Sequence, residues 1–118
     1  MDLEELRVYK RSMELGDKVW GVVDNWSWFQ KDTVGKQLVR AVDSIAANLS
    51  EGFGRYHYRE TKNFSFYSRG SLYETKTWLT KARERNLISE EDYKLFMKEI
   101  KEIGIQLNNY IKSIGPKQ

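Results

Sequence analysis

The chain has 118 residues, of which 40% are hydrophobic and 31% are charged, and its net charge at pH 7 is +3. This length predicts one domain, 1–118, and no apolar run approaches the roughly 18–20 residues that cross a bilayer. The sequence contains no cysteine, which excludes disulfides and thiolate metal sites. The acidic residues 1–5 lack the form of a signal peptide, so we expect a cytoplasmic protein.

The first predicted helix spans residues 3–23. Its apolar side chains recur every three or four positions in two adjoining rows, as in an α-helix with a wide apolar surface. The rows are Leu6, Tyr9, Met13, Gly16, Trp20 and Val23, and beside them Val8, Leu15, Val19 and Val22. A helix in an isolated bundle needs an apolar stripe of only about 100°. We therefore expect this helix to contribute to a subunit interface as well as to the core.

The connector at 24–31 carries three large aromatic residues, Trp26, Trp28 and Phe29. These rings either pack over the end of the bundle as a lid or form a platform on which bases stack. We favour the lid, because large aromatic side chains mostly contribute buried area. The second helix is then expected at 33–51, with Asp32 or Thr33 as its N-cap.

The second helix carries a row of polar residues beside its apolar face, and the third helix, expected at 58–85, continues that row. We call these seven residues the polar stripe: Gln37, Arg40, Ser44, Asn48, Glu51, Ser71 and Glu74. Polar groups at the border of an apolar face need hydrogen-bond partners, so we expect Glu74 to pair with the second helix. Gly52 is expected to end the second helix in a left-handed conformation, and Gly70 to allow close approach of another helix.

The fourth helix is expected at 89–114, with Ser89 as its N-cap and three acidic residues in its first turn. Just before it, Asn86 can end the third helix in the left-handed conformation. Four amphipathic helices joined by short loops predict an all-α fold, an antiparallel up-down-up-down four-helix bundle.

Positive charge is concentrated in one part of the chain. Residues 52–89 contain eight Lys/Arg and three Asp/Glu, whereas the flanking parts are acidic or balanced. A concentrated basic surface attracts phosphate backbones, and the aromatic residues of the corner 52–59 add stacking surfaces. The candidate nucleic-acid-binding residues are Arg55, Arg59, Lys62, Arg69 and Lys76. The alternative is a tight turn whose arginines pair with Glu51 and whose aromatics cover the core or a neighbouring subunit.

The residue patterns required for catalysis or metal binding do not occur in this sequence. A di-iron site in a four-helix bundle uses Glu-x-x-His pairs, but His57 is the only histidine. The inward serines Ser44 and Ser71 have no base at a suitable spacing, and there is no phosphate-binding loop of the Walker type. We therefore expect a protein that is not an enzyme and that uses no cofactor or metal.

A long motif runs through the second and third helices. It reads Q-hydrophobic-hydrophobic-R-A-x-x-S-I-x-x-N-hydrophobic-x-E-G-x-G-R, then a phenylalanine, then G-S-L-x-E. Its residues are Gln37, Arg40, Ala41, Ser44, Ile45, Asn48, Glu51, Gly52, Gly54, Arg55, Phe64, Gly70, Ser71, Leu72 and Glu74. In these residues the chain resembles the small four-helix-bundle proteins encoded in intervening sequences of bacterial 23S rRNA genes. Residues 6–10 resemble the opening of that family, although Tyr9 stands where a tryptophan is usual.

The resemblance has implications for assembly and partners. A related accessory protein of diversity-generating retroelements forms a five-fold ring of such bundles, is basic, and works with a reverse transcriptase and nucleic acid. The resemblance therefore implies a homo-oligomer, with a pentamer as the suggested form, that acts as an adaptor. We predict association with RNA, DNA or a ribonucleoprotein through the basic face. The alternative is a protein–protein adaptor whose basic face meets an acidic partner and no nucleic acid.

Overall fold

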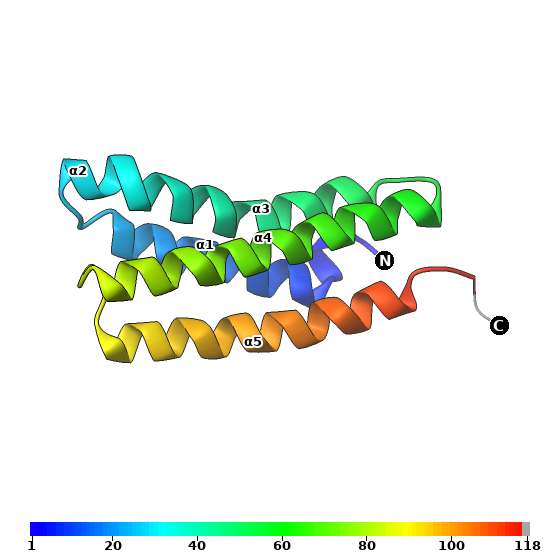
Figure 1. The fold of residues 1–118 in the computed structure, drawn as a ribbon. Coiled ribbons are helices and arrows are strands. Elements are labelled where there is room, and N and C mark those ends of the chain that lie inside the picture. The colour runs from blue at the N-terminus through cyan, green and yellow to red at the C-terminus, as the bar shows by residue number, and fades with distance from the viewer. Residues whose placement is uncertain (117–118) are drawn as a thin grey trace.

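The computed structural model describes residues 1–116, which contain no strand. Four long helices form the body of the molecule: α1 (Arg7–Val23), α3 (Lys36–Phe53), α4 (Tyr58–Glu84) and α5 (Glu90–Ser113). Three short helical segments precede α1 and α3: η1 (Leu3–Glu5), α2 (Trp28–Gln30) and η2 (Lys31–Gly35). Successive long helices run in opposite directions along a rod of 50 × 23 × 20 Å (Figure 1). The predicted all-α four-helix bundle is confirmed.

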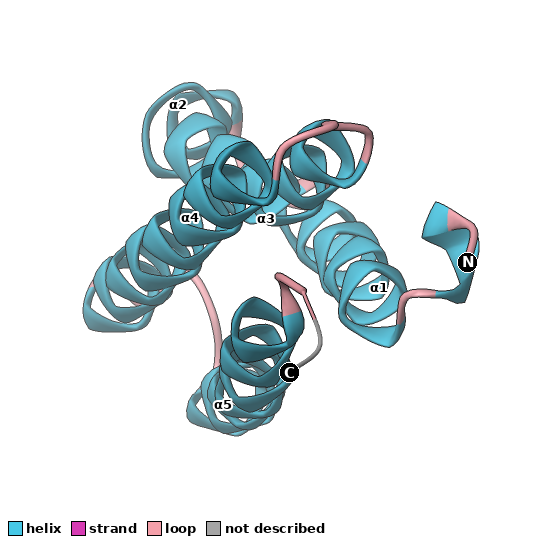
Figure 2. Ribbon diagram, turned by 90° about the vertical axis from the view of Figure 1, so that its right-hand side faces the viewer, coloured by secondary structure: helices cyan, strands magenta, loops and turns pink. Residues whose placement is uncertain are grey.

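The helices pack in the cyclic order α1, α3, α4 and α5, so that α5 closes the bundle between α4 and α1 (Figure 2). Aliphatic side chains from all four helices enter one core. Those with no exposed surface include Leu15, Val42, Ile45, Leu79, Ile103 and Leu107. Because each buried side chain of this size contributes roughly 1.5–3 kcal/mol relative to exposure, this core is the main source of stability.

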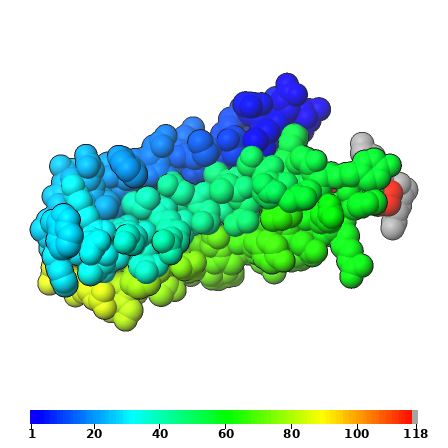
Figure 3. Space-filling view, turned by 90° about the horizontal axis from the view of Figure 1, so that it is seen from above, coloured from blue at the N-terminus to red at the C-terminus, as the bar shows by residue number. Residues whose placement is uncertain are grey.

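Small residues line the contact between α3 and α4, which we call the α3–α4 seam. Ser65, Ser68, Thr75 and Ala82 of α4 are buried. The Ser68 hydroxyl donates a hydrogen bond of 2.7 Å to the main-chain carbonyl of Ile45 in α3. Short side chains let two backbones approach closely, and in the space-filling view the atoms of α3 and α4 form a continuous surface (Figure 3).

Gly52 lies inside α3, and its role differs from the predicted one. The helix continues to Phe53, and Gly52 does not have a positive φ. An added Cβ at Gly52 would lie 2.8 Å from the Phe64 Cβ and 3.2 Å from the Thr61 carbonyl oxygen, both in α4. The prediction that Gly52 ends the helix in a left-handed conformation is therefore wrong. The position requires glycine because α4 leaves no room for a side chain.

Gly70 lies on a different side of α4, where the expected contact with another helix is not found. Gly70 is exposed, and an added Cβ would meet nothing within 4 Å. Glu74 is exposed as well, and within residues 1–116 it shows no ion pair with the polar stripe. Asn48 instead donates a hydrogen bond of 2.9 Å to the Ser44 carbonyl in its own helix. The single chain thus lacks the expected pairing of Glu74 with the second helix.

The second helical stretch begins earlier than predicted. Ser27 is the N-cap of α2: its hydroxyl accepts a hydrogen bond of 3.2 Å from the Gln30 amide, and the Gln30 side chain accepts one of 3.0 Å from the Ser27 amide. This reciprocal arrangement is a capping box of the S-x-x-Q type. Asp32 and Thr33, the predicted caps, lie in the π-helical turn η2, which leads directly into α3.

The aromatic residues of the connector have different environments. Trp26 is half-buried and packs against the core. Trp28 and Phe29 are 77% and 69% exposed. The predicted lid is therefore correct for Trp26 and wrong for the other two rings.

The remaining helix ends agree largely with the sequence. Asn86 has a φ of 59°, which is the left-handed cap predicted for the end of α4. The Ser89 hydroxyl accepts a hydrogen bond of 3.0 Å from the Asp92 amide, as predicted for the start of α5. The first helix differs, because the extended backbone of Leu6 (ψ 110°) separates η1 from α1.

Candidate nucleic-acid interface

An open groove of about 510 Å³ runs between α4 and α5. Its lining residues are Leu72, Tyr73, Lys76, Met97, Ile100, Lys101, Gly104, Ile105 and Asn108. We call it the basic groove, because it contains Lys76 and Lys101 and no carboxylate of residues 1–116 lines it. Within residues 1–116, neither lysine forms an ion pair. The positive charge of the groove is therefore not neutralised by any ion pair within that part of the chain.

Four cations recur at intervals of seven residues along one edge of α4: Lys62, Arg69, Lys76 and Arg83. Contacts with α5 or with the basic groove place Arg69, Lys76 and Arg83 on the edge toward α5. A seven-residue interval keeps side chains on one side of a helix in a bundle. Arg83 is neutralised, since its Nη1 lies 3.8 Å from Glu90 Oε1 and its guanidinium lies 4.1 Å from the centre of the Tyr93 ring. The other three cations form no ion pair with any described residue, and they supply the positive charge of this edge.

Arg69 is held in place by contacts with both helices. Its Nη1 donates a hydrogen bond of 3.1 Å to Asn108 Oδ1 of α5. Its guanidinium carbon lies 4.8 Å from the centre of the Phe66 ring in the preceding turn of α4. Because neither Asn108 nor Phe66 carries a charge, these contacts orient the guanidinium without neutralising it.

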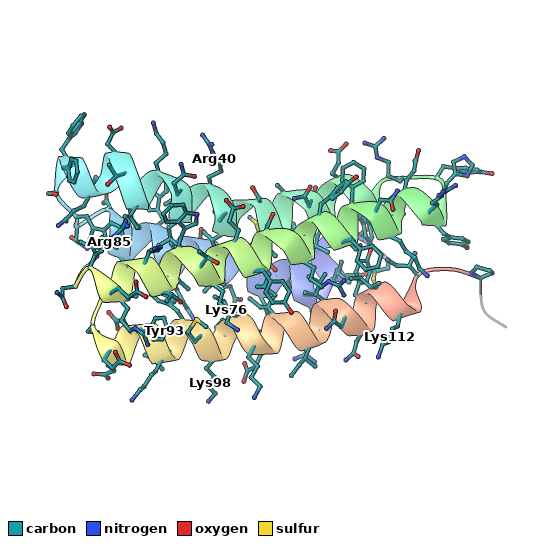
Figure 4. All side chains as sticks on the ribbon, viewed as in Figure 1. Arg40, Lys76, Arg85, Tyr93, Lys98 and Lys112 are labelled. Carbon is teal, nitrogen blue, oxygen red and sulfur yellow. The ribbon has the colours of Figure 1, made fainter. Side chains whose placement is uncertain are left out.

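Figure 4 shows how the cations of the bundle are distributed around α4 and α5. Lys76 extends from α4 into the space between the two helices, whereas Lys98 points away from α4 on the outer side of α5. Arg40 points outward from α3. Of these labelled cations, Lys76 is the one that belongs to the basic groove.

The residues of the predicted corner separate into two groups. Arg55 forms an ion pair with Glu51, and its guanidinium carbon lies 4.8 Å from the centre of the Phe64 ring. Arg59 is exposed at the start of α4, one turn before Lys62. The alternative of a tight turn whose arginines pair with Glu51 is therefore correct for Arg55. Arg59, in contrast, is accessible to a partner.

In the part of the chain that the structure describes, the polar stripe does not join the helices by hydrogen bonds. Four of its members are half-buried, Gln37, Ser44, Asn48 and Ser71, and three are exposed, Arg40, Glu51 and Glu74. The Ser44 hydroxyl donates a hydrogen bond of 2.7 Å to the Arg40 carbonyl one turn earlier. The hydrogen bonds of Ser44 and Asn48 are therefore made within α3.

Two clusters of ionisable side chains have shifted pKa values, and both involve contacts of α1. Arg11 pairs with Glu99 at 3.0 Å and also with Glu102, so that α1 is tied to α5. Hydrogen bonds to these two glutamates raise the pKa of Arg11, and the bond from Arg11 lowers the pKa of Glu102. Burial, followed by repulsion from Asp17, raises the pKa of Asp43 on α3. These shifts belong to helix contacts outside the basic groove.

Sequence reasoning missed three residues of this surface: Phe66, Tyr73 and Lys101. The two rings stand between the predicted cations at spacings of three and four residues, so the signal was present in the sequence. Lys101 belongs to a different helix, and it is the packing of α5 against α4 that places it in the same groove as Lys76.

Residues 1–116 contain no group of three or more His, Cys, Asp or Glu side chains placed to hold a metal ion. Over the same residues, no helix combines the length and the apolar composition that crossing a membrane requires. The basic groove offers ammonium groups, an amide and apolar surface, which is a chemistry suited to binding anions that also carry flat apolar groups.

Comparison with known proteins identifies a family and a shared fold. A protein with unknown function from the S23 ribosomal protein family of Bacteroides thetaiotaomicron VPI-5482 has a similar crystal structure, with a TM-score of 0.83 and 24% sequence identity. The match covers 90% of this chain and 96% of that chain, and at this identity it shows the fold alone. Among curated proteins, none matches this chain significantly. The family described as 23S rRNA-intervening sequence protein matches residues 4–109, so the chain belongs to that family.

Proposed function

We propose that the protein is a cytoplasmic, non-catalytic, homo-oligomeric bundle that associates with nucleic acid or a ribonucleoprotein through the basic groove. The observation that carries this proposal is that Lys76 and Lys101 share a groove in which the described part of the chain places no carboxylate. Lys62 and Arg69 extend the same cationic surface along α4. Phosphate backbones are attracted to a surface of this kind, and their neutralisation releases bound counterions.

The proposal includes self-association, for which the family resemblance suggests a pentamer. Met13 and Trp20 of α1 are 47% and 61% exposed. Trp20 also lines a depression of about 380 Å³ between α1 and α3, together with Val23 and Val39. Contiguous apolar surface commonly marks a protein contact. In the cyclic order of the helices, this surface lies opposite the basic groove, so one molecule can use both at once.

A salt series with a labelled oligonucleotide tests the nucleic-acid contact. We expect log Kd to rise linearly with log salt concentration, because each phosphate contact releases counterions. The variant Lys76→Gln/Lys101→Gln should weaken binding and lower the slope by roughly two. The matched control is Lys98→Gln/Lys112→Gln, which removes the same charge from two exposed lysines of α5 that lie outside the groove.

The control should leave both affinity and slope close to those of the wild type. Equal losses in the two variants would indicate a general attraction to a basic protein and would contradict a specific role for the groove. If the wild type binds neither RNA nor DNA at low salt, the protein–protein adaptor becomes the better description. Light scattering that shows a monomer at micromolar concentration would contradict self-association.

A further inference from the structure

Cations and aromatic rings alternate along the edge of α4 beside the basic groove. We call these five residues the α4 row: Lys62, Phe66, Arg69, Tyr73 and Lys76. Their spacings are four, three, four and three residues. Such spacings keep side chains on one face of an α-helix.

Both rings of the α4 row are exposed although each is large and mostly apolar. Phe66 is 43% exposed and Tyr73 is 64% exposed. The guanidinium of Arg69 lies over Phe66, with 4.8 Å between its carbon and the ring centre, while Tyr73 and Lys76 line the basic groove together. Asn108, which accepts the hydrogen bond from Arg69, also lines that groove. The row from Phe66 to Lys76 therefore forms one connected surface in which each ring has a cation as its neighbour.

A duplex and a single strand present different groups to such a surface. Both carry phosphates, but a duplex stacks the faces of its bases on one another and leaves their edges accessible in the grooves. An unpaired strand can turn its base faces toward aromatic side chains. The α4 row spans about 21 Å at 1.5 Å per residue, which corresponds to about six nucleotides at the 3.4 Å rise of a stacked strand.

We infer that the α4 row binds single-stranded nucleic acid, with its cations on phosphates and Phe66 and Tyr73 stacked on bases. This inference rests on the proposed function and narrows it from nucleic acid in general to one form. Cations alone would suit a duplex equally well, and exposed rings alone would suit another apolar surface. The alternation of the two matches a strand in which phosphates and accessible base faces also alternate.

The test compares two probes on the full chain: a labelled single-stranded oligonucleotide of about twelve nucleotides, twice the length of the row, and a duplex of the same sequence. At low salt the wild type should bind the single strand more tightly. In Phe66→Leu/Tyr73→Leu the single-strand affinity should fall about tenfold for each ring. The slope of log Kd against log salt should stay constant, because no charge is removed, and duplex affinity should change little.

The matched control is Trp28→Leu/Phe29→Leu, which removes two rings that are 77% and 69% exposed on α2. It should bind the single strand as the wild type does. The conservative variant Phe66→Tyr/Tyr73→Phe keeps both rings of the row and should retain affinity. Circular dichroism checks the fold of every variant. If the double leucine variant does not fold, Tyr73→Leu alone, at the more exposed ring, gives the same readout.

The outcomes separate this inference from the proposed function. Equal or tighter binding of the duplex, or a leucine variant that binds the single strand like the wild type, overturns the inference and leaves the proposed function intact. If the wild type binds neither probe, this result contradicts the proposed function and therefore also the inference. A leucine variant with a smaller mass than the wild type in light scattering would show that the row contacts another copy, which also overturns the inference.

Discussion

The two edges of α4 meet their neighbouring helices in different ways. Toward α3, the edge consists of short side chains such as Ser65 and Ser68, which are buried. Toward α5, the edge carries long side chains such as Arg69 and Lys76, and an open groove of about 510 Å³ remains between the helices. The same helix thus holds the bundle together with one edge and presents polar groups to solvent with the other.

This difference separates stability from binding. A closely packed contact has no space for an added methyl group, so changes in side-chain size strain it. Along an open groove, long cationic side chains bury their stems and keep their charged ends in water. We therefore expect substitutions in the α3–α4 seam to change the free energy of unfolding, and substitutions in the groove to change affinity for a partner.

The largest effect on stability is expected for Gly52→Ala. The new Cβ would lie 2.8 Å from the Phe64 Cβ and 3.2 Å from the Thr61 carbonyl oxygen. Both atoms are fixed by the α4 backbone and cannot rotate away, so α3 and α4 must separate. We expect a loss of about 1–3 kcal/mol in the free energy of unfolding, measured by urea denaturation. A loss below about 0.5 kcal/mol would show that the seam is looser than its geometry suggests.

Ser68→Ala should weaken the same seam by a smaller amount. It removes the hydrogen bond of 2.7 Å to the Ile45 carbonyl and leaves a small void. We expect a loss of about 1 kcal/mol, the usual net contribution of a buried hydrogen bond. An unchanged urea midpoint would mean that this bond contributes nothing to the contact between α3 and α4.

Gly70→Ala is the counterpart to Gly52→Ala, because we expect it to raise the free energy of unfolding and not to lower it. An added Cβ at Gly70 meets nothing within 4 Å, and alanine favours the helix by up to about 1 kcal/mol over glycine. We expect a gain in stability in urea denaturation. A loss of stability together with a smaller mass in light scattering would instead indicate that Gly70 touches another copy of the chain.

Arg11→Met tests how α5 is held on its other side, where charge pairs with Glu99 and Glu102 replace close packing. The pKa of Glu102 is lowered in the folded state, so its contribution is present above the unfolded pKa and is lost as pH falls through the folded pKa. We expect a modest loss of stability at pH 7 that shrinks on acidification. Urea titrations of the wild type and the variant at pH 7 and near pH 3 measure this loss in the free energy of unfolding. A difference between wild type and variant that does not change with pH would contradict the charge pairing.

Asp43→Asn should have the smallest effect, at the contact of α3 with α1. Burial and the charge of Asp17 raise the pKa of Asp43, so the folded state favours the neutral carboxyl. Protonated Asp43 contributes its full stabilisation below the pKa of about 3.9 that it has in the unfolded chain. This stabilisation is lost as pH rises through the pKa of Asp43 in the folded protein. The neutral amide should therefore stabilise the protein by a few tenths of a kcal/mol at pH 7, and the gain should vanish in acid. A destabilised variant at pH 7 would contradict this account.

The bundle itself could be predicted because its signals are local. The apolar periodicity of each helix depends on neighbours three and four residues away, and caps such as Ser89 and Asn86 act within one turn. The capping box of Ser27 and Gln30 is an equally local signal. The sequence analysis missed it, because it assigned the N-cap to Asp32 or Thr33.

The features that could not be predicted depend on contacts between distant segments. Gly52 and Gly70 are the same residue type in helical surroundings, yet one faces a neighbouring backbone and the other faces open space. Lys101 shares a groove with Lys76 as a result of how α5 packs on α4. The ion pair between Arg55 and Glu51, in contrast, joins residues that are four positions apart. It could be predicted from the sequence, as the alternative of a tight turn whose arginines pair with Glu51.

We expect the π-helical turn at Lys31–Gly35 to tolerate the deletion of one residue. Such a turn accommodates one residue more than an α-helical turn between the same flanking segments. Deletion of Asp32 can therefore leave a regular helix whose flanks keep their orientations, whereas a deletion within α3 would rotate one part of the helix by about 100° relative to the other. The molecule thus contains a place where evolution or engineering can shorten a helix by a single residue and preserve the fit on either side.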